Sequence, residues 1–146
     1  MSPDQGATLA QAIIDGDAIA VSDGSFKDEY GTAGWTLRGQ DDSIFMTGVN
    51  VTPGKQSAQS AFRSELSGLY GVVTGTEVVC KVFEVKTGQI TVACDGESAL
   101  DYVFDWNNRF LRASTPHLDL IVTIRRMIKA AITAQVEIST CEKTSR

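Results

Sequence analysis

The chain has few cysteines and prolines and no long apolar run. Its 146 residues include three Cys and three Pro. The cysteines (Cys80, Cys94 and Cys141) are odd in number and widely separated, which argues against a disulfide scaffold and against a cysteine-based zinc site. No apolar stretch approaches the roughly 20 residues of a membrane span, and the N-terminus lacks the cationic start of a secretory signal. These absences predict an intracellular protein, in the cytoplasm or nucleus, with no membrane partner.

Basic residues are also in short supply. Lys and Arg number 13 against 18 Asp and Glu, which gives a formal net charge of −5. This balance argues against a protein held on nucleic acid by bulk positive charge, because Lys and Arg drive phosphate binding. It does not argue against one that uses carboxylates for chemistry. A hydrophobic fraction of 42% predicts a single domain over residues 1–146, with 1–17 as a short N-terminal extension.

Hydrophobic periodicity predicts an α/β domain with the element order βββ-α-β-α-α-β. The first three strands, joined by short turns, form an antiparallel meander. Gly68, Gly71 and Gly75 are poor helix formers inside a long predicted helix, which indicates close packing against another element. The predicted elements are helix 9–15, strands 18–26, 33–37 and 44–51, helix 58–79, strand 89–95, helix 97–104, a helix opened by residues 114–119, and strand 132–140.

Two of the predicted strands end at a carboxylate, Asp23 and Asp95, and the long helix carries Glu65 in its first two turns. A carboxylate in an apolar strand is costly to bury without compensation, and ligands gather beyond the strand ends of α/β sheets. Three carboxylates converging there need divalent cations to offset their repulsion, and hard oxygen ligands favour Mg²⁺ or Mn²⁺. Paired ions activate a water and stabilise the leaving oxygen of a phosphodiester. The residue types therefore indicate metal-assisted phosphodiester hydrolysis.

A plainer interpretation of the same residues stays open. Asp23-Gly24 and Asp95-Gly96 are also ordinary turn dipeptides, and Glu65 is equally consistent with a solvated helix residue. Residue types alone do not decide between the two interpretations, because the convergence of the three side chains is inferred from strand ends and helix position.

Three motifs, in order, resemble those of the type 1 ribonuclease H family. The segment VSDGSF at 21–26, followed by a glycine-rich strand, looks like the family's first hairpin. The segment FRSEL at 62–66 resembles its R-x-E-L helix start, and VACDGESAL at 92–100 resembles its fourth-strand motif. The hairpin and the helix also look like ribonuclease H domains of retroelement-type reverse transcriptases. The resemblance covers about residues 18–140, and three motifs in order are a far more specific signal than one.

The resemblance implies a ribonuclease H-like fold, in which a five-stranded mixed sheet of three antiparallel strands and two parallel additions carries helices on its faces. It implies an endonuclease that hydrolyses the RNA strand of RNA–DNA hybrids, a duplex recognised by groove shape and 2′-hydroxyls. Asp23, Glu65 and Asp95 resemble the family's catalytic carboxylates, which hold two Mg²⁺ or Mn²⁺ ions with substrate. The nucleic-acid contacts that it suggests are Ser25, Ser60, Arg63 and Arg109.

The sequence departs from the family pattern after its last predicted strand. The family's fourth carboxylate and mobile histidine follow that strand, and no equivalent follows Thr140 here. The resemblance is therefore to a C-terminally shortened member without the last helix, and we expect weak, Mn²⁺-preferring activity. Asp119 and His117 precede the strand; we expect Asp119 to cap its helix or lie at the surface, and His117 to be a partly exposed loop residue.

Two other interpretations stay open. One is a degenerate or truncated ribonuclease H-like module that binds nucleic acid or a partner without efficient cleavage. The other is a related polynucleotidyl-transferase fold that acts on DNA. The sequence also leaves open the oligomeric state, a homodimer included, and whether the chain is a fragment of a larger polyprotein.

Overall fold

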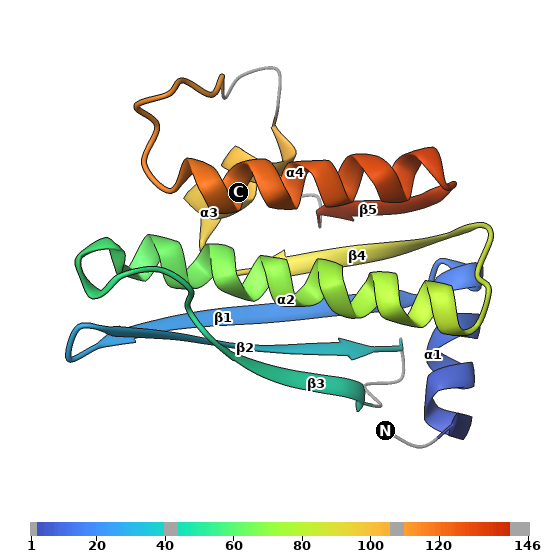
Figure 1. Cartoon of the computed structure of the whole chain (residues 1–146). Helices are drawn as coiled ribbons and strands as arrows, with labels where there is room; N and C mark the ends of the chain where they lie inside the picture. Colours follow the sequence, from blue (N-terminus) through green and yellow to red (C-terminus); the bar gives the residue numbers. More distant parts are fainter. Residues whose placement is uncertain (1–2, 40–43, 106–109, 141–146) are drawn as a thin grey trace, which may run out of the picture.

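A computed structural model describes residues 3–39, 44–105 and 110–140 (Figure 1). Within these ranges, no helix combines the length and apolar character needed to cross a membrane. The elements follow the predicted order. They are α1 (Pro3–Asp15), β1 (Ala18–Lys27), β2 (Tyr30–Arg38), β3 (Ile44–Val51), the 3₁₀ turn η1 (Gln56–Ala58), α2 (Ala61–Val82), β4 (Gly88–Cys94), α3 (Glu97–Phe104), α4 (Leu118–Thr133) and β5 (Val136–Thr140).

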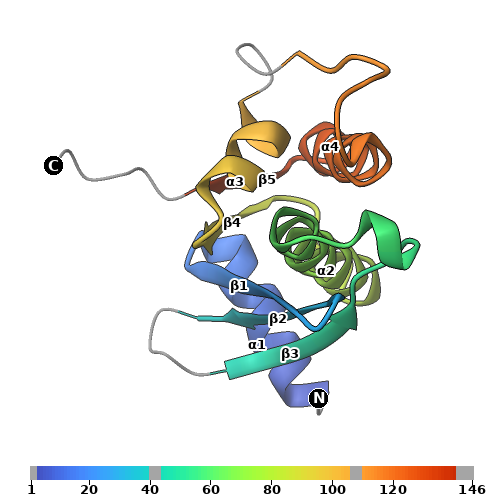
Figure 2. The same cartoon turned by 90° about the vertical axis from the view of Figure 1, so that its left-hand side faces the viewer.

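The five described strands form one mixed sheet in the order β3-β2-β1-β4-β5. β2 is antiparallel to both β1 and β3, whereas β4 is parallel to β1 and β5 is parallel to β4. This is the predicted topology of three antiparallel strands and two parallel additions. α2 lies across β1 and β2, and α4 runs beside it near β5 (Figure 2).

The first hairpin is tighter than the sequence predicts. β1 continues to Lys27 and β2 begins at Tyr30, so only Asp28 and Glu29 form the turn, with φ angles of 52° and 69°. Two left-handed residues match the twist of paired strands, and Asp tolerates this conformation. The polar residues therefore correctly indicated a turn. The two strands extend beyond the apolar segments from which they were predicted, so the turn is shorter than expected.

The helix boundaries also differ from the predicted ones. The predicted helix 58–79 separates into η1 and α2, because Ser60 is extended and its hydroxyl accepts a hydrogen bond from the Arg63 N–H at 3.0 Å. Such an N-cap satisfies a donor that the helix itself leaves unpaired. The last strand begins at Val136 and not at 132, because α4 continues to Thr133.

The predicted close packing of the α2 glycines is confirmed: Gly68 approaches Ser22 of β1, whereas Gly71 and Gly75 approach Trp35 of β2. A Cβ atom on Gly71 would meet the indole Nε1 of Trp35, and one on Gly75 would lie 2.9 Å from the same ring. Gly48 of β3 leaves room for the ring from the strand side. The Trp35 Nε1–H donates to Asn50 Oδ1 at 3.0 Å. Small residues on both sides thus let one large aromatic side chain fix α2 against the sheet.

The core lies between the sheet and the two long helices. Leu9 and Ile13 of α1 are fully buried in it, so part of the predicted N-terminal extension contributes to the core. Burial of such side chains is the main favourable term in folding. The largest side chains in the core are Leu9, Ile13, Leu37, Leu66, Leu69, Ile90, Ile121, Ile124 and Ile128.

Candidate active site

The carboxylate of Glu65 lies between β1 and the end of β4. The Gly24 N–H donates to its Oε1 at 3.2 Å, and the Cys94 thiol donates to its Oε2 at 3.2 Å. Gly24 directly follows Asp23, and Cys94 directly precedes Asp95. The neighbours of both strand carboxylates therefore contact the helix carboxylate, and the three predicted ligands come from one junction of β1, α2 and β4.

Two glycines create the space for Glu65. A Cβ atom on Gly24 would lie 2.6 Å from the Glu65 backbone N, and one on Gly96 would lie 2.7 Å from Glu65 Cγ. Gly24 is inside β1, paired with Ala33 of β2, and is not part of a turn. The ordinary-turn interpretation of Asp23-Gly24 is thus wrong, because this glycine is needed for the close approach of α2 to the strand.

Asp23 lies on the sheet face that is opposite to α2. Its neighbour Ser22 is 3% exposed and faces α2, where a Cβ atom on Gly68 would lie 3.1 Å from Ser22 Cβ. Since side chains alternate along a strand, Asp23 projects to the other face, and it is exposed. There it borders a hollow of about 510 Å³, whose wall also includes Ser25 and Val49.

The donor set has the chemistry of a site for a hard divalent cation, because Asp23, Glu65 and Asp95 supply carboxylate oxygens. Asp95 is exposed just beyond β4, and Glu65 is half-buried. Within the described part of the chain, no three His, Cys, Asp or Glu side chains lie close enough together to hold a metal ion. The three carboxylates share a junction, but the charge of Glu65 is offset by N–H and S–H donors.

Comparison with known proteins finds similarity in fold but none in sequence. No protein-family model matches the chain, and the search of curated proteins gives no match. Among solved structures, RNase H1 from the halophilic archaeon Halobacterium salinarum aligns with a TM-score of 0.57 and 14% identity, over 85% of this chain and 83% of that one. LC11-RNase H1 was isolated from compost by a metagenomic approach and solved with an RNA/DNA hybrid. It aligns with a TM-score of 0.65 and 9% identity, over 86% of each chain.

A viral structure extends the same likeness. The foamy viral protease-reverse transcriptase, solved with dsDNA, aligns with a TM-score of 0.61 and 14% identity, over 91% of this chain and 86% of that one. The chain has the ribonuclease H fold. The fold expected from the three sequence motifs is thereby confirmed. At sequence identities this low, the alignments show a common fold and do not show a common activity.

Within this ribonuclease H fold, Cys94 is the site residue that sequence reasoning missed. Burial above all, with a smaller contribution from the hydrogen bond to Glu65, raises the pKa of its thiol to about 12. The thiol therefore stays protonated and is the donor in its contact with Glu65, while its sulfur accepts from the Gly96 N–H at 3.3 Å. The available signal was strand alternation, which places Cys94 beside Ser22, on the face toward α2.

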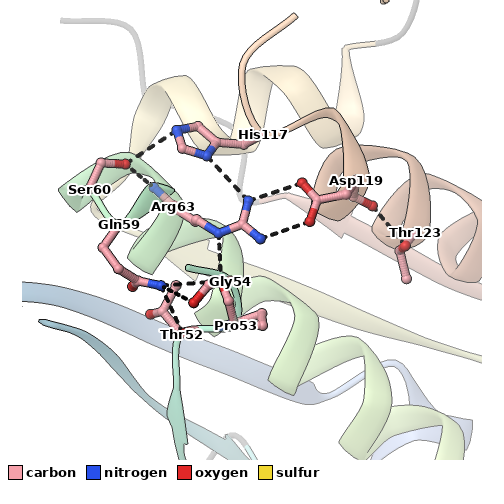
Figure 3. Close-up of polar contacts among 9 residues, drawn as sticks. All are labelled: Thr52, Pro53, Gly54, Gln59, Ser60, Arg63, His117, Asp119 and Thr123. Atoms are coloured by element: carbon pink, nitrogen blue, oxygen red, sulfur yellow. Dashed lines mark hydrogen bonds and ion pairs between the residues drawn. The ribbon is translucent and has the colours of Figure 1, made fainter. Parts of the chain in front are cut away.

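Arg63 connects the start of α2 to the start of α4 (Figure 3). Its guanidinium donates to both carboxylate oxygens of Asp119, at 3.0 and 2.7 Å, and its Nε–H donates to the Pro53 carbonyl at 2.6 Å. Arg63 is only 4% exposed. Its side chain is buried and paired within the fold, and its contact with nucleic acid stays a prediction. Asp119 pairs with this arginine and lies at the surface, one of the two places expected for it, whereas His117 occupies the N-cap position of α4.

His117 and Ser60 extend the Arg63 cluster. His117 Nε2 lies 3.3 Å from the Ser60 hydroxyl, and its Nδ1 lies 3.3 Å from Arg63 Nη1. Burial, and then the Arg63 charge, lower the pKa of His117, so the ring is neutral at pH 7. A neutral ring can accept from Arg63 at Nδ1 and donate to Ser60 at Nε2. Arg109, the last predicted nucleic-acid contact, lies outside the described residues.

Replacing Asp119 with Asn is expected to lower stability at neutral pH but not in strong acid. Hydrogen bonds from Arg63 lower the pKa of Asp119 to about 2, so the pair stabilises the fold above the ordinary carboxyl pKa of about 3.9, and this stability is lost as pH falls toward 2. Because the Asp119 side chain is 67% exposed, solvent screening limits the loss in Asp119→Asn to about 1 kcal/mol. Urea unfolding at pH 7 and pH 2 measures it; an equal deficit at both pH values would contradict the assignment.

Proposed function

We propose that the protein is a metal-dependent endonuclease that hydrolyses the RNA strand of RNA–DNA hybrids. The observation that carries the proposal is a pair of hydrogen bonds to the Glu65 carboxylate. Their donors are the immediate neighbours of Asp23 and Asp95 in the chain. The ribonuclease H fold and the three ordered motifs support it. One structural neighbour, LC11-RNase H1, was solved with an RNA/DNA hybrid, which makes this duplex the first substrate to test.

The three carboxylates act together in the proposal, as metal ligands. Asp23, Glu65 and Asp95 would hold two Mg²⁺ or Mn²⁺ ions, which, when bound with substrate, supply an activated water and stabilise the leaving oxygen. The chain itself fixes Glu65 through the Gly24 N–H and the Cys94 thiol. Asp23 and Asp95 are exposed, so both are open to a phosphate backbone that approaches from solvent.

The surface around Asp23 is where we place the nucleic acid. Ser25 lies in the wall of the same hollow as Asp23, and hydroxyl side chains commonly contact phosphate and sugar groups. Ser60 and Arg109 stay predicted contacts. With 13 basic against 18 acidic residues, few cations are available to neutralise phosphates, so we expect weak binding that falls further as salt rises.

The proposal is tested by offering labelled RNA–DNA hybrid, duplex DNA and duplex RNA to the protein in Mg²⁺ or Mn²⁺. We expect cleavage of the RNA strand in the hybrid alone, and faster cleavage in Mn²⁺ than in Mg²⁺, because Mg²⁺ demands a nearly ideal octahedral geometry. Cleavage of duplex DNA would favour a DNA-acting member of the fold. A clear Mg²⁺ optimum with high turnover would contradict the expected metal preference.

A binding module is the second candidate function. The absence of a three-ligand group among the described residues favours it, since a module that no longer cleaves has no need to gather its carboxylates. Hybrid binding without cleavage in either metal would support this candidate and reject the nuclease.

A further inference from the structure

A cavity of about 540 Å³ lies between the C-terminal halves of α2 and α4, beside β5. The two helices run side by side in both views of the fold (Figures 1 and 2). This volume falls within the range of about 300–1,000 Å³ that is typical of small-molecule sites. None of the candidate active-site carboxylates lines it. Its inner wall includes Val73, Thr76, Cys80, Ala131, Val136 and Ile138.

The cavity exists because α4 changes from large to small side chains along one stripe. Ile121, Ile124 and Ile128 face the core and are at most 2% exposed. The next positions of that stripe, at helical spacing, are Ala131 and Ala134, and both line the cavity. Ala131 is half-buried, and Ala134, at the C-cap just after α4, is exposed. Because both side chains are small where the stripe carries isoleucine before, they leave a space open beside the close-packed core.

The interior of the cavity offers no polar group that a ligand would need to satisfy. The Thr76 hydroxyl already donates to the Val72 carbonyl at 2.8 Å. The Cys80 thiol is half-buried, and burial raises its pKa, so it is neutral at pH 7. The rest of the inner wall is aliphatic. A ligand body inside the cavity is therefore expected to be apolar.

The rim of the cavity is cationic. It carries Lys81, Lys86 and Arg126 against a single carboxylate, Glu77. Lys81 pairs with Glu77 at 2.9 Å, whereas Lys86 and Arg126 have no ion pair among the described residues. In a chain of net charge −5, this concentration of positive charge over an apolar space favours an anionic head group.

We propose that the cavity binds an amphiphilic anion, with an unbranched apolar chain between α2 and α4 and a carboxylate head at Lys86 and Arg126. Burial of the ligand's apolar chain against the apolar wall favours binding, and the two exposed cations favour a negatively charged head group. This site goes beyond the proposed nuclease function and is independent of it, so neither proposal depends on the outcome of the other.

The probe is decanoate, titrated into the protein calorimetrically below the concentration at which it forms micelles. We expect saturable binding of one decanoate per chain. Decylamine has the same chain and the opposite charge, and we expect it to bind at least about tenfold more weakly. Alkylation of Cys80, followed by peptide mapping, should slow severalfold when decanoate is bound, whereas alkylation of Cys94, which is not in the cavity wall, should not. Equal binding of both probes would overturn the proposal.

Two variants separate the chain site from the head-group site. Ala131→Ile continues the isoleucine stripe, fills the cavity and should abolish decanoate binding. Replacing Lys86 and Arg126 together with Gln leaves the walls intact and should weaken binding about fivefold to tenfold, since each exposed ion pair contributes modestly. Lys55→Gln removes a cation that does not line the cavity and should change nothing. Parent-like binding in the double variant would overturn the proposal even if Ala131→Ile fails to fold.

Discussion

Asp23→Asn is expected to reduce hydrolysis of the RNA–DNA hybrid about a thousandfold without unfolding the protein. Metal-held charge stabilisation is worth several kcal/mol in the transition state, and each 1.4 kcal/mol corresponds to a factor of ten in rate. Asn has the shape of Asp but carries no charge, so it is a much weaker ligand for Mg²⁺ or Mn²⁺. Asp23 is exposed on the sheet face away from α2, and the free energy of unfolding should change by less than about 0.5 kcal/mol.

The matched control for this variant is Asp28→Asn. Asp28 is also exposed and lies in the same hairpin, but it forms the turn, at a φ of 52° that Asn tolerates well. It removes the same charge from the chain, so any effect of net charge on hybrid binding appears in both variants. Cleavage by Asp23→Asn at the rate of the parent would show that the proposed site is wrong. Equal losses in both variants would show that charge, and not ligation, is responsible.

Much of the fold was predictable because its strands and helices carry strong periodic signals. β3 and α3 begin and end where the sequence places them, and the strand order follows from the meander and the two later strands. The α2 glycines were correctly linked to close packing, although the sequence did not identify Trp35 as the residue that Gly71 and Gly75 meet. That contact pairs residues far apart in the chain, and helix periodicity carries no information about its partner.

The candidate site was less predictable because its contacts depend on three elements meeting. Asp23, Glu65 and Asp95 could be chosen from their motifs, but nothing in the motifs indicated that a thiol donates a hydrogen bond to Glu65. Arg63 was predicted as a nucleic-acid contact from the resemblance alone, and its burial and its pairing with Asp119 were not expected. Helix position alone did not reveal this, because the partner lies on another helix.

Gly24→Ala is expected to damage both stability and activity, and it tests whether close approach places Glu65. The new methyl group would lie 2.6 Å from the Glu65 backbone N and from the Ser64 carbonyl carbon. Neither atom can move without the start of α2 moving as well. Overpacking of this kind costs about 1–3 kcal/mol, and a shift of about 1 Å at a catalytic group can cost roughly a hundredfold in rate.

Gly34→Ala is the matched control for the stability effect. Gly34 pairs with Asp23 in the same hairpin, and a Cβ atom there would meet nothing within 4 Å. Because alanine restricts the unfolded chain more than glycine does, this variant should be unchanged or more stable by up to about 1 kcal/mol. Urea unfolding compares the two variants. Equal stability of Gly24→Ala and Gly34→Ala would contradict the idea that the close approach of α2 to β1 positions Glu65. The position of the carboxylate would then depend on its hydrogen bonds alone.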